Sequence, residues 1–111
     1  MINQKVTLLT LAILGANSAF AGDSNGLVSR ISQYEGLTMF TAGTHNNKLS
    51  CQISNNGGEA WAISVYSAHG KAMLALIMSA QAQGKRMQVW GDSSCSTWYS
   101  LETAASVEIT D

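Results

Sequence analysis

Apolar and polar residues alternate in several short stretches of the chain, which predicts a protein built mainly of β-strands. Residues 60–66 alternate most clearly, with Trp61 and Ile63 on one face and Ala62 and Ser64 on the other. Other stretches alternate in the same way or are rich in β-forming residues. The expected strands are 27–34, 37–42, 60–66, 86–90 and a last one marked by Ala105, Val107 and Ile109.

Residues 71–83 have the composition of a helix. They include no glycine, no proline and no β-branched run, and most are strong helix formers. Ser67 is suited to cap the N-terminus, and Gly84 is suited to end the helix in the left-handed conformation. Both ends of this helix are therefore predicted.

This helix has two apolar faces. The face expected to pack on the core follows the i, i+3, i+4, i+7 spacing and consists of Met73, Leu76, Ile77 and Ala80. A second apolar set falls on roughly the opposite side and consists of Leu74, Ala75, Met78 and Ala82. One core cannot cover both sides, so the second set is predicted to form an interface between copies of the chain. The alternative is that these are ordinary exposed apolar residues.

The first 21 residues have the layout of a secretory signal peptide. One lysine precedes an apolar run at residues 6–16, and Ala19-Phe20-Ala21 is a cleavage site flanked by small residues. Cleavage after Ala21 leaves residues 22–111 as a single domain. The protein is therefore expected to be exported, to the periplasm or beyond it, and not to remain inserted in a membrane.

Charge and composition narrow the set of partners. Residues 22–111 contain five Lys and Arg against seven Asp and Glu, a formal net charge of −2. Because nucleic acids and anionic lipids attract basic surfaces, neither is an expected partner.

Cys51 and Cys95 are the two cysteines of the chain. In an oxidising compartment they are expected to form a disulfide, which contributes about 3–4 kcal/mol in the loop-entropy treatment. The chain has no CxxC motif, and His45 and His69 are not spaced as ligands with either cysteine, so no metal site and no cofactor are expected.

The order of elements is three strands, a helix and two strands. This order is typical of the OB-fold, a small five-stranded barrel whose helix closes one end between the third and fourth strands. An open α+β sheet with one helix has the same order and is the alternative. Residues 43–58 are expected to form an irregular excursion, in which residues 49–53 could pair briefly as a strand.

The candidate chemistry favours binding over catalysis. Both histidines are expected in turns or polar loops, and no nucleophile motif accompanies them. The carboxylates that could act in pairs are all expected at turns, loops or outward strand positions: Glu35, Glu59, Asp92, Glu102 and Glu108. These positions predict solvated surface groups and a non-enzymatic protein.

The loop that contains Cys95 combines hydroxyls, a carboxylate and two aromatic rings. The candidate ligand-binding residues are Asp92, Ser94, Trp98 and Tyr99. Such a mixture suits a sugar, whose hydroxyls need directional partners and whose apolar ring face stacks on an aromatic side chain. The alternative is that an aromatic side chain of this loop caps the barrel.

Residues 70–109 carry a resemblance to known proteins through the sequence GKAMLALIMSAQAQGKRMQVWGDSSCSTWYSLETAASVEI. The GKAM helix, the basic step into a strand and the CSxW loop resemble a group of small exported bacterial proteins. That group is similar, more distantly, to the B subunit of subtilase cytotoxin and related AB-toxin B subunits. The resemblance implies an OB-fold domain that forms a ring, commonly a pentamer, and binds cell-surface glycans. The competing expectation is a periplasmic structural or inhibitor-like domain that binds another protein through the apolar helix face.

Overall fold

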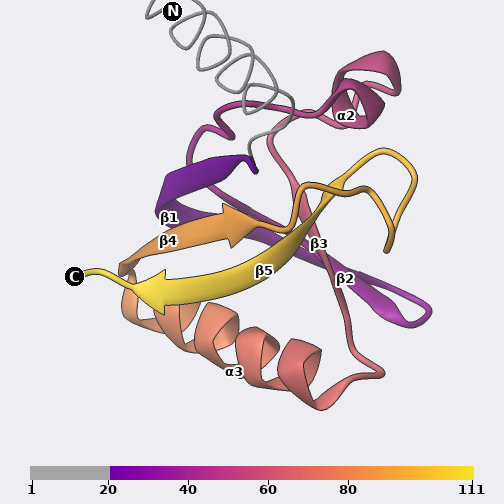
Figure 1. The fold of residues 1–111 in the computed structure, drawn as a ribbon. Coiled ribbons are helices and arrows are strands. Elements are labelled where there is room, and N and C mark those ends of the chain that lie inside the picture. Colours follow the sequence, from indigo (N-terminus) through magenta and orange to yellow (C-terminus); the bar gives the residue numbers. More distant parts are fainter. Residues whose placement is uncertain (1–20) are drawn as a thin grey trace, which may run out of the picture.

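Five strands close into a ring in the computed structural model, which describes residues 21–111 (Figure 1). The predicted signal peptide lies outside the described residues except for Ala21. Around the ring the order is β1-β2-β3-β5-β4, with bounds β1 Asp23–Tyr34, β2 Leu37–Ala42, β3 Trp61–Ser64, β4 Arg86–Gly91 and β5 Glu102–Ile109. The mainly β prediction is confirmed. Because the strands close, the open-sheet alternative is wrong.

Closure depends on the length of β1. Its first half pairs with β4 and its second half with β2, and the register shifts between Val28 and Arg30. Such a bulge bends a strand and lets it serve two partners. The structure therefore begins β1 at Asp23, four residues before the predicted start. All pairings are antiparallel except the one between β3 and β5, which is parallel.

Helix α3, Ala68–Gln83, covers one end of the ring and contacts β1, β3, β4 and β5 (Figure 1). Ser67 accepts a hydrogen bond from the Gly70 amide as N-cap, and Gly84 ends the helix with φ 64°. Both predicted caps are confirmed. Met73, Ile77 and Ala80 are buried in the core, as predicted.

Leu76 corrects the predicted core face, because its side chain is 42% exposed. Gly70 takes part in the packing face instead, since it lies directly against the carbonyl oxygen of Ser64. The face is thus rotated away from Leu76 and toward Leu74, which is partly buried and packs against the core.

A short helix, α2 at Ser50–Ser54, occupies the segment where a brief strand was expected. The amides of Gln52 and Ile53 both donate to the carbonyl of Leu49, and the Gly57 amide donates to Gln52. These local bonds satisfy the backbone without a neighbouring strand. In Figure 1, α2 lies on the side of the ring opposite α3.

Strand β3 is buried on both faces. Trp61 and Ile63 point into the main core, as their alternation predicts. Ala62, on the other face, is also fully buried, because Leu37 and Leu101 pack against it together with the partly buried Trp98. The loop between β4 and β5 thus folds over the outside of β3.

Candidate functional site

The turn between β1 and β2 and the loop between β4 and β5 enclose a hollow of about 410 Å³ at one edge of the ring. We call it the turn–loop hollow. Its lining consists of Tyr34, Glu35, Gly36, Leu37, Ser64, Tyr66, Ser96, Thr97 and Trp98. The lining therefore provides three aromatic side chains, three aliphatic hydroxyls in addition to the phenolic hydroxyls of the two tyrosines, and one carboxylate.

The aromatic rings of the hollow are held by contacts between distant segments. The rings of Tyr34 and Trp98 meet edge to face with centroids 5.5 Å apart. The ring of Tyr66 lies so close over Gly36 that a Cβ at this position would overlap it. The Val65 amide donates to the Gly36 carbonyl at 2.9 Å, which fixes the chain that leads to Tyr66. The absence of a side chain at Gly36 thus leaves the room that the ring of Tyr66 occupies.

Exposure differs among these aromatic side chains. Tyr34 is 50% exposed and Tyr66 is 81% exposed, whereas Trp98 is partly buried against the outside of β3. The tyrosines therefore offer ring surface to a ligand, and Trp98 both supports the fold and lines the hollow. Trp98 packs on the outer face of β3, in a cluster separate from the main core, and this differs from the predicted alternative of an aromatic side chain that caps the barrel.

The four predicted ligand-binding residues do not share one cavity. Trp98 lines the turn–loop hollow and also a neighbouring hollow of about 250 Å³. Asp92 lines a separate hollow beside the start of α3, and its carboxylate accepts hydrogen bonds from the amide and hydroxyl of Ser94. Tyr99 is 63% exposed and lies against Trp98, with ring centroids 5.2 Å apart. Tyr34 and Tyr66, which come from other segments, were missed.

The second hollow that Trp98 lines is formed mostly by β1, β2 and the chain before β3. Its polar lining includes Arg30, Ser32, Thr41 and Asn56. Trp98 is thus shared by the two hollows.

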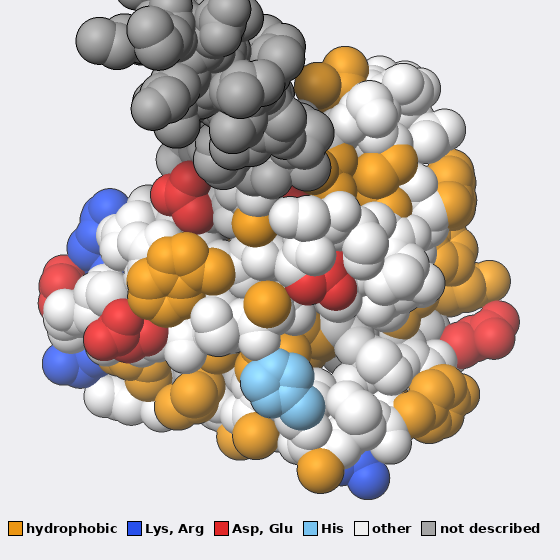
Figure 2. Space-filling model, viewed as in Figure 1, with side chains coloured by type: hydrophobic (Ala, Val, Ile, Leu, Met, Phe, Trp, Pro, Cys, Tyr) orange, Lys and Arg blue, Asp and Glu red, His pale blue; other side chains and the backbone are white. Residues whose placement is uncertain are grey.

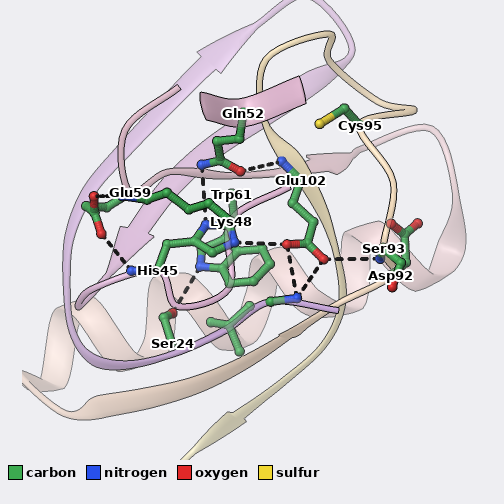
Figure 3. Close-up of polar contacts among 12 residues, drawn as sticks. Ser24, His45, Lys48, Gln52, Glu59, Trp61, Asp92, Ser93, Cys95 and Glu102 are labelled. Carbon is green, nitrogen blue, oxygen red and sulfur yellow. Dashed lines mark hydrogen bonds and ion pairs between the residues drawn. The ribbon is translucent and has the colours of Figure 1, made fainter. Parts of the chain in front are cut away.

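Glu102 corrects the prediction that the candidate carboxylates are solvated, because its side chain is fully buried. One carboxylate oxygen accepts from Nε2 of His45 at 2.9 Å, and the other accepts from the Ser93 amide at 3.1 Å. The Gly22 amide lies within 3.2 Å of both oxygens. The carboxylate thus ties together three segments far apart in the sequence (Figure 3).

The prediction that His45 is a polar loop residue is wrong. Its side chain is fully buried, and its ring stacks on Trp61 with centroids 3.8 Å apart. The indole N–H of Trp61 in turn donates to the hydroxyl of Ser24 at 3.0 Å (Figure 3). His69 lies in the first turn of α3, and its Nε2 is 2.6 Å from the carbonyl oxygen of Ala105.

Gln52 connects the buried side chains of His45 and Glu102 to the excursion between β2 and β3. Its carbonyl oxygen accepts from the backbone amide of Glu102 at 2.9 Å, and its nitrogen donates to the carbonyls of Gly58 and Ala60. The same nitrogen lies 3.3 Å from Nδ1 of His45. No sequence motif marked this glutamine, although its place beside Cys51 was a hint that the segment is anchored.

Glu59 holds the outer side of this excursion. Its carboxylate accepts from Nζ of Lys48 at 2.5 Å and from the backbone amide of His45 at 2.7 Å. The hydrogen bond from Lys48, followed by that from the His45 amide, lowers the pKa of Glu59 below its usual value of 4.5. The prediction of a solvated group holds in part, since the side chain is 39% exposed.

The predicted disulfide between Cys51 and Cys95 is confirmed, with Cα atoms 6.5 Å apart. It links α2 to the loop that lines the turn–loop hollow. Within residues 21–111, His, Cys, Asp and Glu form no group of three placed to hold a metal ion.

The predicted interface residues lie on α3 but differ in exposure. Ala75, Met78 and Ala82 are exposed, with Met78 at 56%, whereas Leu74 is partly buried against the core. In Figure 2, hydrophobic side chains gather along the edge where Figure 1 places α3. The outward face of α3, defined here as Ala75, Leu76, Met78 and Ala82, thus exposes four apolar side chains, with Lys71 one turn before Ala75 on the same side.

Comparison with protein-family models, with curated proteins and with solved structures gave no significant match. Of the described helices, none has the length and apolar character needed to cross a membrane.

Proposed function

We propose that this protein is an exported, non-enzymatic binding module with an OB-fold that binds a carbohydrate in the turn–loop hollow. The observation that carries the proposal is the contact between Tyr34 and Trp98, which joins the first turn of the ring to its last loop. Three aromatic side chains and several hydroxyls meet there in one open hollow.

The order of strands supports the OB-fold. A ring in the order β1-β2-β3-β5-β4, with a helix between the third and fourth strands, follows the path of that fold. OB-folds bind oligosaccharides and oligonucleotides on the face of strands 2 and 3 and on the loops between strands 1 and 2 and between strands 4 and 5. The turn–loop hollow occupies the position of these two loops.

The chemistry of the lining favours a sugar over a nucleic acid. Aromatic rings offer a flat apolar surface for the hydrophobic face of a pyranose, and the hydroxyls of Ser64, Ser96 and Thr97 can pair with sugar hydroxyls. Among the described residues that line the hollow, the only charged side chain is the carboxylate of Glu35, which would repel a phosphate. A neutral or amino-substituted sugar fits this lining best.

A structural role for the buried pair supports the non-enzymatic part of the proposal. His45 and Glu102 have no exposed side-chain surface, and the carboxylate of Glu102 accepts hydrogen bonds from His45 and from the backbone amides of Gly22 and Ser93. A catalytic base must reach the proton it abstracts. This pair holds the fold together instead.

Assembly into a ring of copies is the second part of the proposal. The outward face of α3 leaves Leu76 and Met78 exposed on a helix whose only charged residue is Lys71. Residues 70–109 resemble a group of small exported bacterial proteins that is similar, more distantly, to toxin B subunits, and this resemblance implies the same assembly. The alternative function, a periplasmic structural or inhibitor-like domain, uses the same face to bind a different protein.

Carbohydrate binding is tested with the exported protein on a glycan array, followed by calorimetry with the best sugar. Tyr66→Ala removes the most exposed ring of the hollow without opening the core, so the fold should persist while affinity falls by at least about fivefold, roughly 1 kcal/mol. Trp98→Ala should abolish binding, but it also disturbs the packing outside β3. Tyr66→Ala is therefore the decisive variant.

Trp90→Ala is the matched control, because Trp90 is 42% exposed on β4 and lines none of the hollows described above. It should bind sugar like the wild type. The proposal fails if no glycan binds the wild type, or if Tyr66→Ala and Trp90→Ala affect binding equally.

A further inference from the structure

The buried carboxylate of Glu102 lacks a formal counter-charge in the uncleaved chain. Its three hydrogen-bond donors are Nε2 of His45 and the amides of Gly22 and Ser93. Among residues 21–111, His45 is the only side chain within ion-pair distance. His45 would supply a positive charge opposite the carboxylate only if its second ring nitrogen, Nδ1, also carried a proton.

Gln52 lies against the second ring nitrogen of His45, Nδ1. Its carbonyl oxygen is committed to the Glu102 amide and its nitrogen to two backbone carbonyls, so the amide cannot be flipped without losing these bonds. The nitrogen of Gln52 consequently faces Nδ1 of His45 at 3.3 Å. Both hydrogens of this nitrogen go to the carbonyls of Gly58 and Ala60, and an amide nitrogen does not accept, so a proton on Nδ1 would find no acceptor there. Nε2, which faces the carboxylate, is the ring nitrogen placed to donate.

A fully buried carboxylate among neutral donors is costly, because burial removes the solvation of its charge. The position of Gly22 offers the missing cation. Its nitrogen lies 3.2 Å from one oxygen of Glu102 and 3.0 Å from the other, although a peptide amide has only one hydrogen to share between them. An ammonium at the same place has three hydrogens and a full positive charge.

We propose that cleavage of the Ala21–Gly22 bond creates an N-terminal ammonium on Gly22 that forms a buried ion pair with Glu102. Water adds across the peptide bond, Ala21 keeps the carboxylate, and the nitrogen of Gly22 becomes the ammonium. A peptidase that recognises small residues at the positions of Ala19 and Ala21 would perform this hydrolysis. The inference rests on the proposed export of the chain, and it assigns to that cleavage a role in the fold.

Only glycine fits at position 22. A Cβ at position 22 would lie 2.5 Å from Oε1 of Glu102, 2.6 Å from Nε2 of His45 and 2.7 Å from the carbonyl oxygen of Asn46. The carbonyl of Gly22 accepts from the Gly91 amide at 2.9 Å, which fixes the residue from the other side. Because Gly22 is buried, cleavage takes place before the ring closes around it.

The first test is the N-terminal sequence and intact mass of the protein recovered after export, where we expect Gly22 to be the first residue. The amine is then probed with an acylating reagent near neutral pH. We expect it to react at least about tenfold more slowly in the folded protein than in urea, because reaction requires local opening. A different first residue, or equal reactivity in both states, overturns the proposal.

A second test uses protein released from a fusion in vitro, so that its result does not depend on export. A form that begins at Ala21 has an amide at position 22, and we expect its melting temperature to fall by about 4–8 °C. With Glu102→Gln the two forms should melt together, whereas with Glu108→Gln, on the same strand, the difference should remain. If Glu102→Gln does not fold, amine protection in the wild type decides. Equal melting of the two wild-type forms overturns the ion pair but leaves carbohydrate binding untouched.

Discussion

Gly70 lies in the first turn of α3, where the helix passes closest to the end of β3. A Cβ at this position would overlap the carbonyl oxygen of Ser64, and its amide already bonds to the hydroxyl of Ser67 at 2.9 Å. Gly-to-Ala changes inside helices usually stabilise by about 0.5–1 kcal/mol. At Gly70, the contact with the Ser64 carbonyl makes the same change destabilising instead.

We expect Gly70→Ala to destabilise the protein by about 1–3 kcal/mol, since the helix must shift away from β3. Urea unfolding followed by circular dichroism measures the change. Ala72→Gly, on the exposed side of the same turn, is the control and should cost only about 1 kcal/mol through helix propensity. A Gly70→Ala protein as stable as the wild type would mean that the close approach is not rigid.

Glu59 is the residue whose ionisation should affect stability in acid. Lys48 lowers its pKa in the folded protein, so the carboxylate contributes stability above its usual, unfolded pKa of 4.5, and this contribution is lost as pH falls through the lower folded pKa. The side chains are 29% and 39% exposed, which limits the contribution to less than about 1 kcal/mol.

Glu59→Gln should therefore lower the urea midpoint at pH 7, and the difference from the wild type should shrink at pH 3. Glu108→Gln, which removes an exposed carboxylate on β5, controls for the general loss of negative charge. A difference that persists unchanged at pH 3 would show that the ion pair is not its source.

At the scale of elements, the disulfide acts on the excursion between β2 and β3. This excursion has one short helix and is held by Cys51, by Gln52 and by the bonds to Glu59. The disulfide spans 44 residues, which corresponds to about 4 kcal/mol in the loop-entropy treatment. Because it also fixes the loop of Trp98, its loss should reach the turn–loop hollow.

We expect the double substitution Cys51→Ala and Cys95→Ala to cost about 4 kcal/mol in urea unfolding. Hydrogen exchange should increase in residues 43–60 and 92–101 more than in α3, which packs elsewhere. A reductant should change the wild type in the same direction and leave the alanine protein unaffected. Uniform acceleration over all elements would indicate a global effect instead.

The sequence predicted those elements that local pattern determines. The caps of α3, most strand positions and the disulfide all follow from residue types at fixed spacing. The burial of Glu102 could not be read in this way, because the register shifts where Trp90 and Gly91 face Ser106 and Ala104. Val107 and Ile109 pack on the core after the shift, and Glu102 turns inward before it. Alternation extended backward from Ile109 therefore places Glu102 outside.

The lining of the proposed binding site could not be predicted from the sequence for a different reason. Trp98 was found because it lies in a loop of hydroxyl-rich composition, but Tyr34 and Tyr66 come from a strand end and from the chain before α3. Only closure of the ring brings them to one hollow. Similarly, the sequence around His45 is that of a polar loop, and the burial of His45 results from its contacts with Trp61 and Glu102, which are distant in the sequence.

For the whole molecule, the proposed assembly of copies depends on the outward face of α3. Leu74, an expected interface residue, packs partly on the core of its own chain, so replacing it would damage the fold as well as an interface. Ala75 and Met78 are exposed, and their substitution separates the two effects. Substitutions at Ala75 and Met78, rather than at Leu74, are therefore the test of assembly.

We expect protein that begins at Gly22 to have a solution mass of several protomers by light scattering, near five for a ring like those of toxin B subunits. Ala75→Glu with Met78→Glu should convert it to monomers, because apposed copies would bury unpaired carboxylates. Ser106→Glu, at an exposed position on β5, should keep the assembled mass. A monomeric wild type would exclude the ring and favour a different protein as the partner of this face, whereas dissociation by Ser106→Glu as well would place the interface on the strands.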